Sequence, residues 1–191
     1  MHSHGISHLD LSLENTMIAS VDANHIHVKI IDFGLARRVK SDQMFHDRVG
    51  KIGYMAPEVC MQCPYLFFFL YVYARKEYSP EKADIWCLGV MLFMMLVGAP
   101  PYQVPDPSNP AFRFLVNGRL RDVLVHWKRL PLIPADALDV MSKIFKPESQ
   151  RISMKDLRLH KFVGLSDKTT TDDKADALNL SSPLVAQDKN R

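Results

Sequence analysis

Residues 79–98 form a strongly apolar stretch with a clear helix start and a clear stop. Ser79-Pro80-Glu81 offers an N-cap hydroxyl, a proline whose φ suits the first turn, and an acid at the positive end of the helix dipole. Gly98 and the proline at position 100 end the pattern. Because apolar side chains recur on every side, the pattern predicts a helix that is buried all round.

Amphipathic spacing predicts further helices downstream. Apolar residues recur at helical intervals over 109–127, with an interruption at Asn117-Gly118, and again over 135–145. A last helix is predicted from Ser153, where a Ser-x-x-Asp sequence resembles a capping box whose acid is one carbon shorter than the usual glutamate.

One short hairpin is predicted before the long helix. Residues 17–21 and 28–31 are rich in β-branched side chains and flank the polar turn Asp22-Ala23-Asn24. These strands would present Asn15 and Asp32 side by side. The predicted fold class is therefore mainly α with a small β-hairpin.

Composition sets the limits of the folded domain and of its partners. After about residue 165 the chain is rich in Ser, Thr, Asp, Lys and Asn, so we predict one domain over 1–165 and a disordered tail over 166–191. The net charge of +3, from 24 basic and 21 acidic residues, favours neither nucleic acid nor an anionic membrane as a partner.

Three cysteines, Cys60, Cys63 and Cys87, bear on the cellular location. With no N-terminal signal pattern, they favour a reducing intracellular compartment, and we expect the cytoplasm. The Cys60-x-x-Cys63 sequence has no second pair and no neighbouring histidine, so we do not expect it to bind a metal.

Four motifs follow one another along the first third of the chain. They are His8-Leu9-Asp10, Asn15 five residues after the aspartate, Asp32-Phe33-Gly34 and Ala56-Pro57-Glu58. Their order and spacing resemble the second half of the protein-kinase signature set. The chain thus resembles the C-terminal lobe of a eukaryotic serine/threonine protein kinase, from His4 to about Phe162, a truncated form of that α+β fold. Seven residues precede His8, so we expect the ATP-covering N-terminal lobe to be missing.

The resemblance implies phosphoryl transfer with ATP and Mg²⁺ as cofactors and a protein as substrate. Asp10 would accept the proton of the substrate hydroxyl, while Asn15 and Asp32 would hold magnesium on the nucleotide phosphates. Met17 falls where the family places an apolar residue under the adenine.

The resemblance also implies structural roles for six residues. Asp84, at the start of Asp84-Ile85-Trp86, would anchor the backbone of the catalytic loop, and Glu58 would pair with Arg151. The others are His8, as the buried histidine of the catalytic loop, and Phe33 and Gly34, which complete the metal-binding motif.

The sequence departs from the family pattern at three positions. Leu9 replaces the arginine that receives an activation-loop phosphate, so we do not expect switching by loop phosphorylation. Ser12 replaces a catalytic lysine, and Lys51 stands where the family has a threonine that contacts the same site. We hypothesise that Lys51 reaches into the site, supplies the missing cation and pairs with the Ser12 hydroxyl. The alternative is unrelated drift at both positions.

Residues 60–75 are an anomalous insertion. They are apolar, aromatic and aggregation-prone, in a place where the family has a short surface loop. The run is too short to cross a bilayer, which takes about 20 residues. Translated intron sequence and a membrane-surface or partner-binding loop are both open explanations.

Two functions compete. The first is ATP-dependent phosphoryl transfer to protein Ser or Thr hydroxyls, although the isolated chain is expected to be inactive because it lacks a glycine-rich loop, the strand lysine and the helix glutamate. The second is an inactive truncated lobe that binds a partner near Phe112–Trp127. A metal site at His2, His4 and His8 is a third, weaker interpretation, since the catalytic loop already uses His8.

Overall fold

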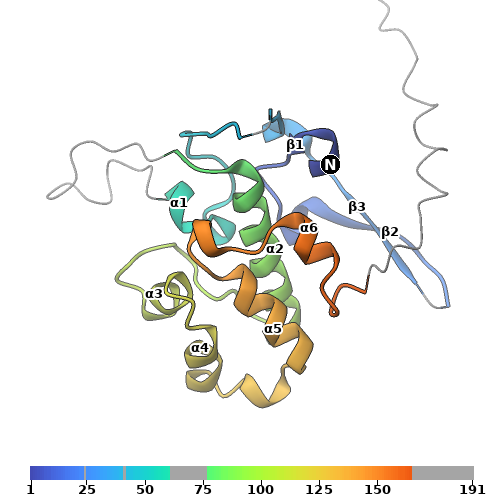
Figure 1. Ribbon diagram of the computed structural model, residues 1–191. Helices are drawn as coiled ribbons and strands as arrows, with labels where there is room; N and C mark the ends of the chain where they lie inside the picture. Colours follow the sequence, from blue (N-terminus) through green and yellow to red (C-terminus); the bar gives the residue numbers. More distant parts are fainter. Residues whose placement is uncertain (24, 41, 61–76, 165–191) are drawn as a thin grey trace, which may run out of the picture.

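The computed structural model describes residues 1–23, 25–40, 42–60 and 77–164 (Figure 1). The strands are Ile6–Ser7 (β1), Thr16–Val21 (β2), Ile26–Ile30 (β3) and Arg37–Arg38 (β4). The helices are Pro57–Cys60 (α1), Pro80–Val97 (α2), Pro110–Val116 (α3), Leu120–His126 (α4), Ala135–Ile144 (α5) and Met154–Arg158 (α6). The predicted tail, and the predicted insertion beyond Cys60, lie outside the described residues.

Helix α2 is the central element, and its ends are those that the sequence predicts. The Ser79 side chain accepts a hydrogen bond from the Lys82 amide, and Gly98 ends the helix with a φ of 82°. The prediction that the helix is buried all round is wrong. Met95 is 63% exposed, because no element within the described part of the chain packs over this side of its C-terminal half.

The base of the molecule is a set of helices packed against α2. Trp86 lies edge-on to Phe145 with ring centroids 5.0 Å apart, and Phe93 lies 5.6 Å from Trp127 in the same manner. At Gly89 an added Cβ would collide with Ile144, so α2 and α5 come this close only because position 89 has no side chain. The base therefore has a continuous, tightly packed core.

The other predicted helices also form. Helices α3 and α4 fill the predicted 109–127 region and are separated at Asn117 and Gly118. Ser153 caps α6 by accepting a hydrogen bond from the Asp156 amide, and its hydroxyl donates to the Asp156 carboxylate at 2.6 Å. The acid thus bonds to the cap side chain, whereas a capping-box acid reaches the cap backbone.

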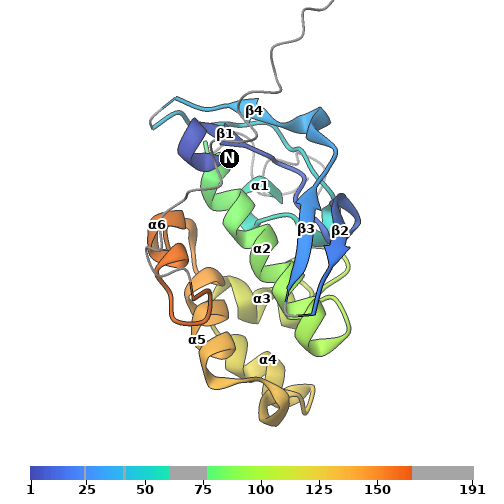
Figure 2. The same ribbon diagram turned by 90° about the vertical axis from the view of Figure 1, so that its right-hand side faces the viewer.

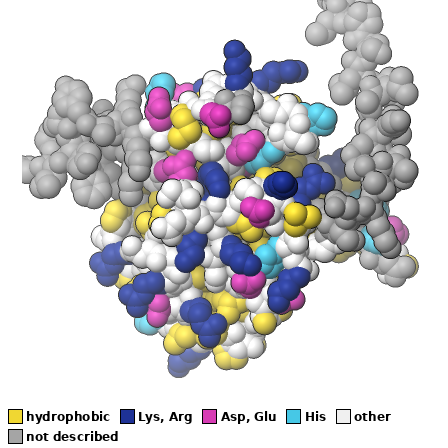
Figure 3. All heavy atoms as spheres, viewed as in Figure 1, with side chains coloured by type: hydrophobic (Ala, Val, Ile, Leu, Met, Phe, Trp, Pro, Cys, Tyr) yellow, Lys and Arg dark blue, Asp and Glu magenta, His cyan; other side chains and the backbone are white. Residues whose placement is uncertain are grey.

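Charges of both signs cover the face that carries the helical base. Figure 3 shows Lys and Arg interspersed with Asp and Glu there. One example is the pair between Lys143 and Asp139 on α5, whose Nζ and Oδ2 atoms are 2.9 Å apart. Among the described residues, no helix combines the length and the apolar character needed to cross a membrane.

The predicted hairpin is formed by β2 and β3, which pair antiparallel and project from the helical body (Figures 1 and 2). Ile18 lies opposite Val28, and Val21 lies opposite Ile26. The irregularity in β2 between Ile18 and Ser20 brings Val21 to the face that Ile18 already occupies. One face of the hairpin is therefore apolar, and these four side chains are between 57% and 68% exposed.

The activation segment, residues 33–58, is attached to the body at several points. Its strand β4 pairs with β1, where Arg37 lies opposite Ser7. Phe45 and Tyr78 exchange two backbone hydrogen bonds of 2.8 Å, and the Tyr78 hydroxyl donates to the Asp47 carbonyl at 2.7 Å. Arg37 also pairs with the Asp47 carboxylate at 2.7 Å.

Candidate active site

Asp84, in the second turn of α2, fixes the backbone of residues 8–15, which we call the catalytic loop. Its carboxylate is fully buried and accepts hydrogen bonds from the amides of His8 and Leu9, both at 2.8 Å. The His2 ring nitrogen Nε2 lies 2.8 Å from the same carboxylate. Leu9 has a φ of 65°, an uncommon value for a leucine, which these contacts maintain. These contacts therefore fix the backbone conformation of the loop at His8 and Leu9.

His8 connects the catalytic loop to the strand that carries Asp32. The imidazole is fully buried, its Nε2 lies 3.1 Å from the Ile31 carbonyl oxygen, and its ring lies 4.9 Å from that of Phe33. The Ile31 amide in turn donates to the Asn15 carbonyl at 2.9 Å. These contacts join the segment that carries Asn15 to the segment that carries Asp32.

Asp10 and Asn15 are joined directly. The Asn15 side-chain amide donates to the Asp10 carbonyl at 2.8 Å and to its carboxylate Oδ2 at 2.9 Å. The Ser12 hydroxyl between them accepts the Asn15 backbone amide at 3.3 Å. Because both donors of the Asn15 amide are engaged, its Oδ1 atom is left as the acceptor that faces the rest of the site.

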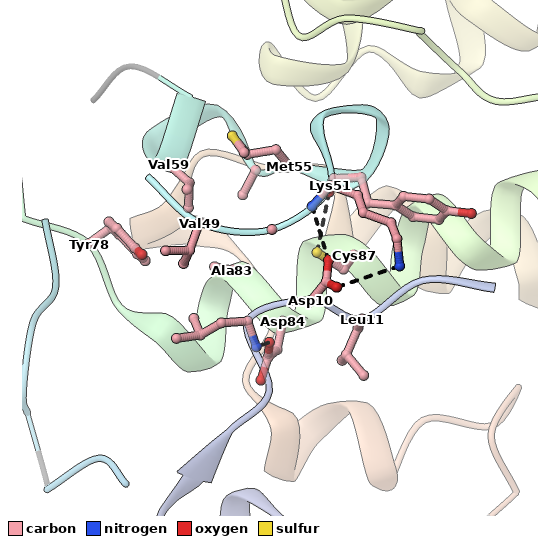
Figure 4. A pocket seen from close by; sticks show the side chains of 14 residues that line it. Asp10, Leu11, Val49, Lys51, Met55, Val59, Tyr78, Ala83, Asp84 and Cys87 are labelled. Atoms are coloured by element: carbon pink, nitrogen blue, oxygen red, sulfur yellow. Dashed lines mark hydrogen bonds and ion pairs between the residues drawn. The ribbon is translucent and has the colours of Figure 1, made fainter. Parts of the chain in front are cut away.

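Lys51 reaches Asp10 from the activation segment (Figure 4). Its backbone amide donates to Asp10 Oδ1 at 3.0 Å. Its ammonium Nζ lies 2.9 Å from Ser12 Oγ, 3.0 Å from Asn15 Oδ1 and 3.5 Å from Asp10 Oδ2. Gly50 allows the approach, because it has a φ of 98° and a Cβ there would lie 2.6 Å from the Leu9 carbonyl.

Asp32 and Met17 lie on the exposed side of the site. Asp32 follows β3 with a φ of 60°, and its Oδ1 accepts the Gly34 amide at 3.2 Å. Phe33, beside it, is 53% exposed, as is Met17 on β2. The Asp32 carboxylate and an apolar surface are therefore open to a ligand.

Glu58 and Arg151 form a buried ion pair at the end of the activation segment. Arg151 Nη2 lies 2.9 Å from Glu58 Oε2, and Nη1 donates to the Lys82 carbonyl at 2.7 Å. The guanidinium also lies 4.9 Å from the centre of the Trp86 ring. The pair fastens α1 to the start of α2.

Glu14 and Tyr78 are among the groups near the site that have shifted pKa values. A hydrogen bond from its own backbone amide lowers the pKa of Glu14, and nearby Tyr54, Ser12 and Lys51 act in the same direction. Burial raises the pKa of Tyr78 to about 12, and the Asp47 charge adds to the shift. Sequence reasoning did not predict a role for Tyr78, since only the fold reveals its long-range contacts.

The site offers hard oxygen ligands of the kind that Mg²⁺ prefers, namely the Asn15 amide oxygen and the Asp32 carboxylate. Within the described ranges, no three His, Cys, Asp or Glu side chains gather as a metal cluster. The donor set fits an ion that completes its coordination with phosphate and water. Of the histidines considered as an alternative site, His2 contacts Asp84 and His8 contacts a backbone carbonyl.

Comparison with known proteins places the chain in a family. Residues 1–163 match the protein kinase domain. The chain is 33% identical over 163 residues to Calcium-dependent protein kinase 34 of Arabidopsis thaliana, covering 85% of this chain and 27% of that protein. It is 31% identical over 191 residues to Serine/threonine-protein kinase CHK1 of Mycosarcoma maydis, covering 97% and 26%. The chain thus spans about a quarter of the length of these relatives. The resemblance is confirmed: the chain belongs to the eukaryotic protein kinase family.

Proposed function

We propose that this chain is the C-terminal lobe of an ATP-dependent protein kinase whose reaction is the transfer of the γ-phosphoryl group to serine or threonine hydroxyls. The observation that carries the proposal is the direct contact between the side chains of Asp10 and Asn15. Both residues lie in the catalytic loop, which also contacts the segment that carries Asp32. The serine/threonine preference rests on the relatives named above.

Asp10 acts as the base. Asn15 and the Lys51 amide hold its carboxylate, one on each oxygen, so that it faces an incoming hydroxyl in a fixed orientation. The substrate oxygen forms a bond to the γ-phosphorus as the bond from that phosphorus to the bridging oxygen of ADP breaks. The hydroxyl proton ends on Asp10, and ADP carries away the electron pair.

Asn15 Oδ1 and the Asp32 carboxylate would hold magnesium against the phosphates. When bound, the ion neutralises phosphate charge and orients the γ-phosphoryl group. Met17 supplies an exposed apolar side chain on which the adenine ring would rest. The 191 residues hold no glycine-rich loop, so we expect the isolated chain to bind nucleotide weakly and to turn over negligibly.

The competing partner-binding function has less support. Along the expected docking region the large apolar residues are buried in the core, among them Phe112, Leu115 and Leu124, each at most 2% exposed. A partner at this place would have to use the remaining side chains, such as Val125 at 58% exposed. We therefore rank phosphoryl transfer first.

The test is a phosphorylation assay on the protein expressed from its complete natural coding sequence. With labelled ATP we expect transfer to Ser and Thr peptides, and the Asp10→Asn variant should lose about 10²–10⁴-fold in kcat. Asp122→Asn, an exposed acid on α4, is the matched control and should keep full activity. Equal rates for the Asp10 variant and the parent protein would refute the proposal, and the binding role would then replace it.

A further inference from the structure

Lys51 is the one Lys or Arg, among the residues that the structure describes, whose side chain hydrogen-bonds to the catalytic loop at Asp10, Ser12 or Asn15. It lies in the activation segment, 41 positions along the chain from Asp10. The cation of this site therefore comes from a different segment than the proposed proton acceptor, Asp10.

Two features fix the Lys51 side chain at this place. The backbone hydrogen bond to Asp10 Oδ1 holds its root against the catalytic carboxylate. Its ammonium has three protons, and the three oxygens within reach belong to Ser12, Asn15 and Asp10. Ser12 is fully buried, so its short side chain leaves space that the long Lys51 side chain occupies.

The ammonium is positioned for a ligand as well as for these contacts. The Lys51 side chain is 38% exposed, while that of Asp10 is 13% exposed. Of its three contacts the longest, 3.5 Å, joins Nζ to Asp10 Oδ2. A phosphoryl group that approaches the substrate hydroxyl beside Asp10 would also meet this ammonium, since the charge that develops in transfer spreads over the phosphoryl oxygens.

We propose that Lys51 is a catalytic residue that binds an oxygen of the phosphoryl group in transfer, and that Ser12 positions it. This inference rests on the proposed function. Lys51 takes no part in proton transfer: its ammonium pairs with the phosphoryl oxygen, while the hydroxyl proton goes to Asp10. Because Lys51 lies in the activation segment, the position of its ammonium depends on the placement of that segment, which the contacts of Tyr78 with Phe45 and Asp47 hold.

The first test uses the whole 191-residue chain and ³¹P NMR of Mg·ATP at millimolar concentration, which detects weak binding. We expect the chain to perturb all three phosphate resonances. The Lys51→Met variant should lose the γ-phosphate perturbation and keep that of the α-phosphate, whereas Lys51→Arg should retain both. Arg121→Met, which removes one exposed positive charge from α4, is the matched control and should behave as the parent chain.

Exchanging the two residue types gives a second, independent variant. The double change Ser12→Lys with Lys51→Thr puts the lysine back on the catalytic loop and should restore the γ-phosphate perturbation, whereas Ser12→Lys alone should not increase it. In the protein from the complete coding sequence, Lys51→Met should lower kcat about 10²–10³-fold with a much smaller change in KM for ATP. Circular dichroism of each variant monitors the fold.

The outcomes separate this inference from the proposed function. Asp32→Asn should abolish the perturbation of all three resonances. If it does so while Lys51→Met leaves the γ-phosphate signal intact, the role of Lys51 is refuted and the nucleotide site stands. If Asp32→Asn changes nothing while Lys51→Met removes the γ-phosphate perturbation, the nucleotide site at Asp32 is refuted and the role of Lys51 stands. If the parent chain perturbs no resonance, both are refuted.

Discussion

The helical base and the hairpin treat their apolar residues in opposite ways. In the base, Trp86, Phe93 and Phe145 are fully buried and stack edge to face around α2. In the hairpin, Ile18 and Val21 are as apolar as any core residue and yet more than 60% exposed. The base is thus complete in its packing, whereas the hairpin presents a surface whose burial would add stability.

The candidate catalytic residues lie at the junction of these two regions. Polar contacts rather than packing hold them there: Asp84 binds the catalytic-loop amides from the base side, and the Ile31 amide binds Asn15 from the hairpin side. The geometry of the candidate site therefore depends on a small number of hydrogen bonds, some of which come from the helical base.

The largest effect should come from breaking the base at its buried ion pair. Arg151→Met removes the guanidinium that pairs with the buried Glu58 carboxylate and should lower the free energy of unfolding by about 3–5 kcal/mol. Urea denaturation measures this loss. The double change Arg151→Met with Glu58→Met should recover much of it, because the buried carboxylate is removed together with the guanidinium. A double variant less stable than the single one would contradict this account.

A smaller effect should follow from removing the Tyr78 hydroxyl, which ties the activation segment to the base. Tyr78→Phe loses the hydrogen bond to Asp47 and should cost about 1 kcal/mol. The pKa of Tyr78 is raised to about 12 in the folded protein, whereas an unfolded tyrosine ionises near pH ~10. The folded state favours the neutral Tyr78 hydroxyl. The stability that comes from this preference is therefore fully present below pH ~10 and is lost as the pH rises through about 12.

Urea unfolding at several pH values checks this sign. Over the range from pH ~9 to pH ~12 the parent chain should lose more stability than Tyr78→Phe does. Burial also raises the pKa of Cys87 and of Tyr102, but both groups are present in the two proteins, so the difference between the curves isolates Tyr78. Parallel curves would show that the hydroxyl is not held in the neutral form.

The smallest effect should come from the apolar face of the hairpin. Ile18→Thr, at a position 64% exposed, should change the free energy of unfolding by no more than about 0.5 kcal/mol. The matched change Val90→Thr, at a fully buried position of α2, should cost about 1–3 kcal/mol, because it buries a hydroxyl. Equal costs at the two positions would mean that the hairpin face is covered in solution.

How much the sequence predicted differs between the same two regions. The ends of α2 were predictable because Ser79 and Gly98 act on neighbouring backbone groups, and the hairpin because its strands flank a polar turn. The exposure of Met95 was not predictable, since periodicity records which side chains are apolar and not what packs over them. The fold also brings Arg37 to Asp47, a contact for which neither residue carries a local signal.

Within the site, the motifs indicated which residues would meet but not the contacts by which they do. Spacing singled out Asp10, Asn15 and Asp32 as a set, and the departures at Ser12 and Lys51 suggested a contact that the structure places at 2.9 Å. The backbone hydrogen bond from Lys51 to Asp10 left no trace in the sequence, because every residue type except proline has that amide.

That backbone hydrogen bond makes position 51 suitable for an unnatural amino acid. An amide that anchors the chain regardless of its side chain tolerates an unnatural amino acid, so a fluorophore or a photoreactive group could be installed there while the main chain keeps its grip on Asp10. Such a probe would lie beside Asp10, between the catalytic loop and the activation segment. Because it replaces the Lys51 ammonium, its emission or its crosslinks would report the movement of the activation segment relative to Asp10 and not turnover.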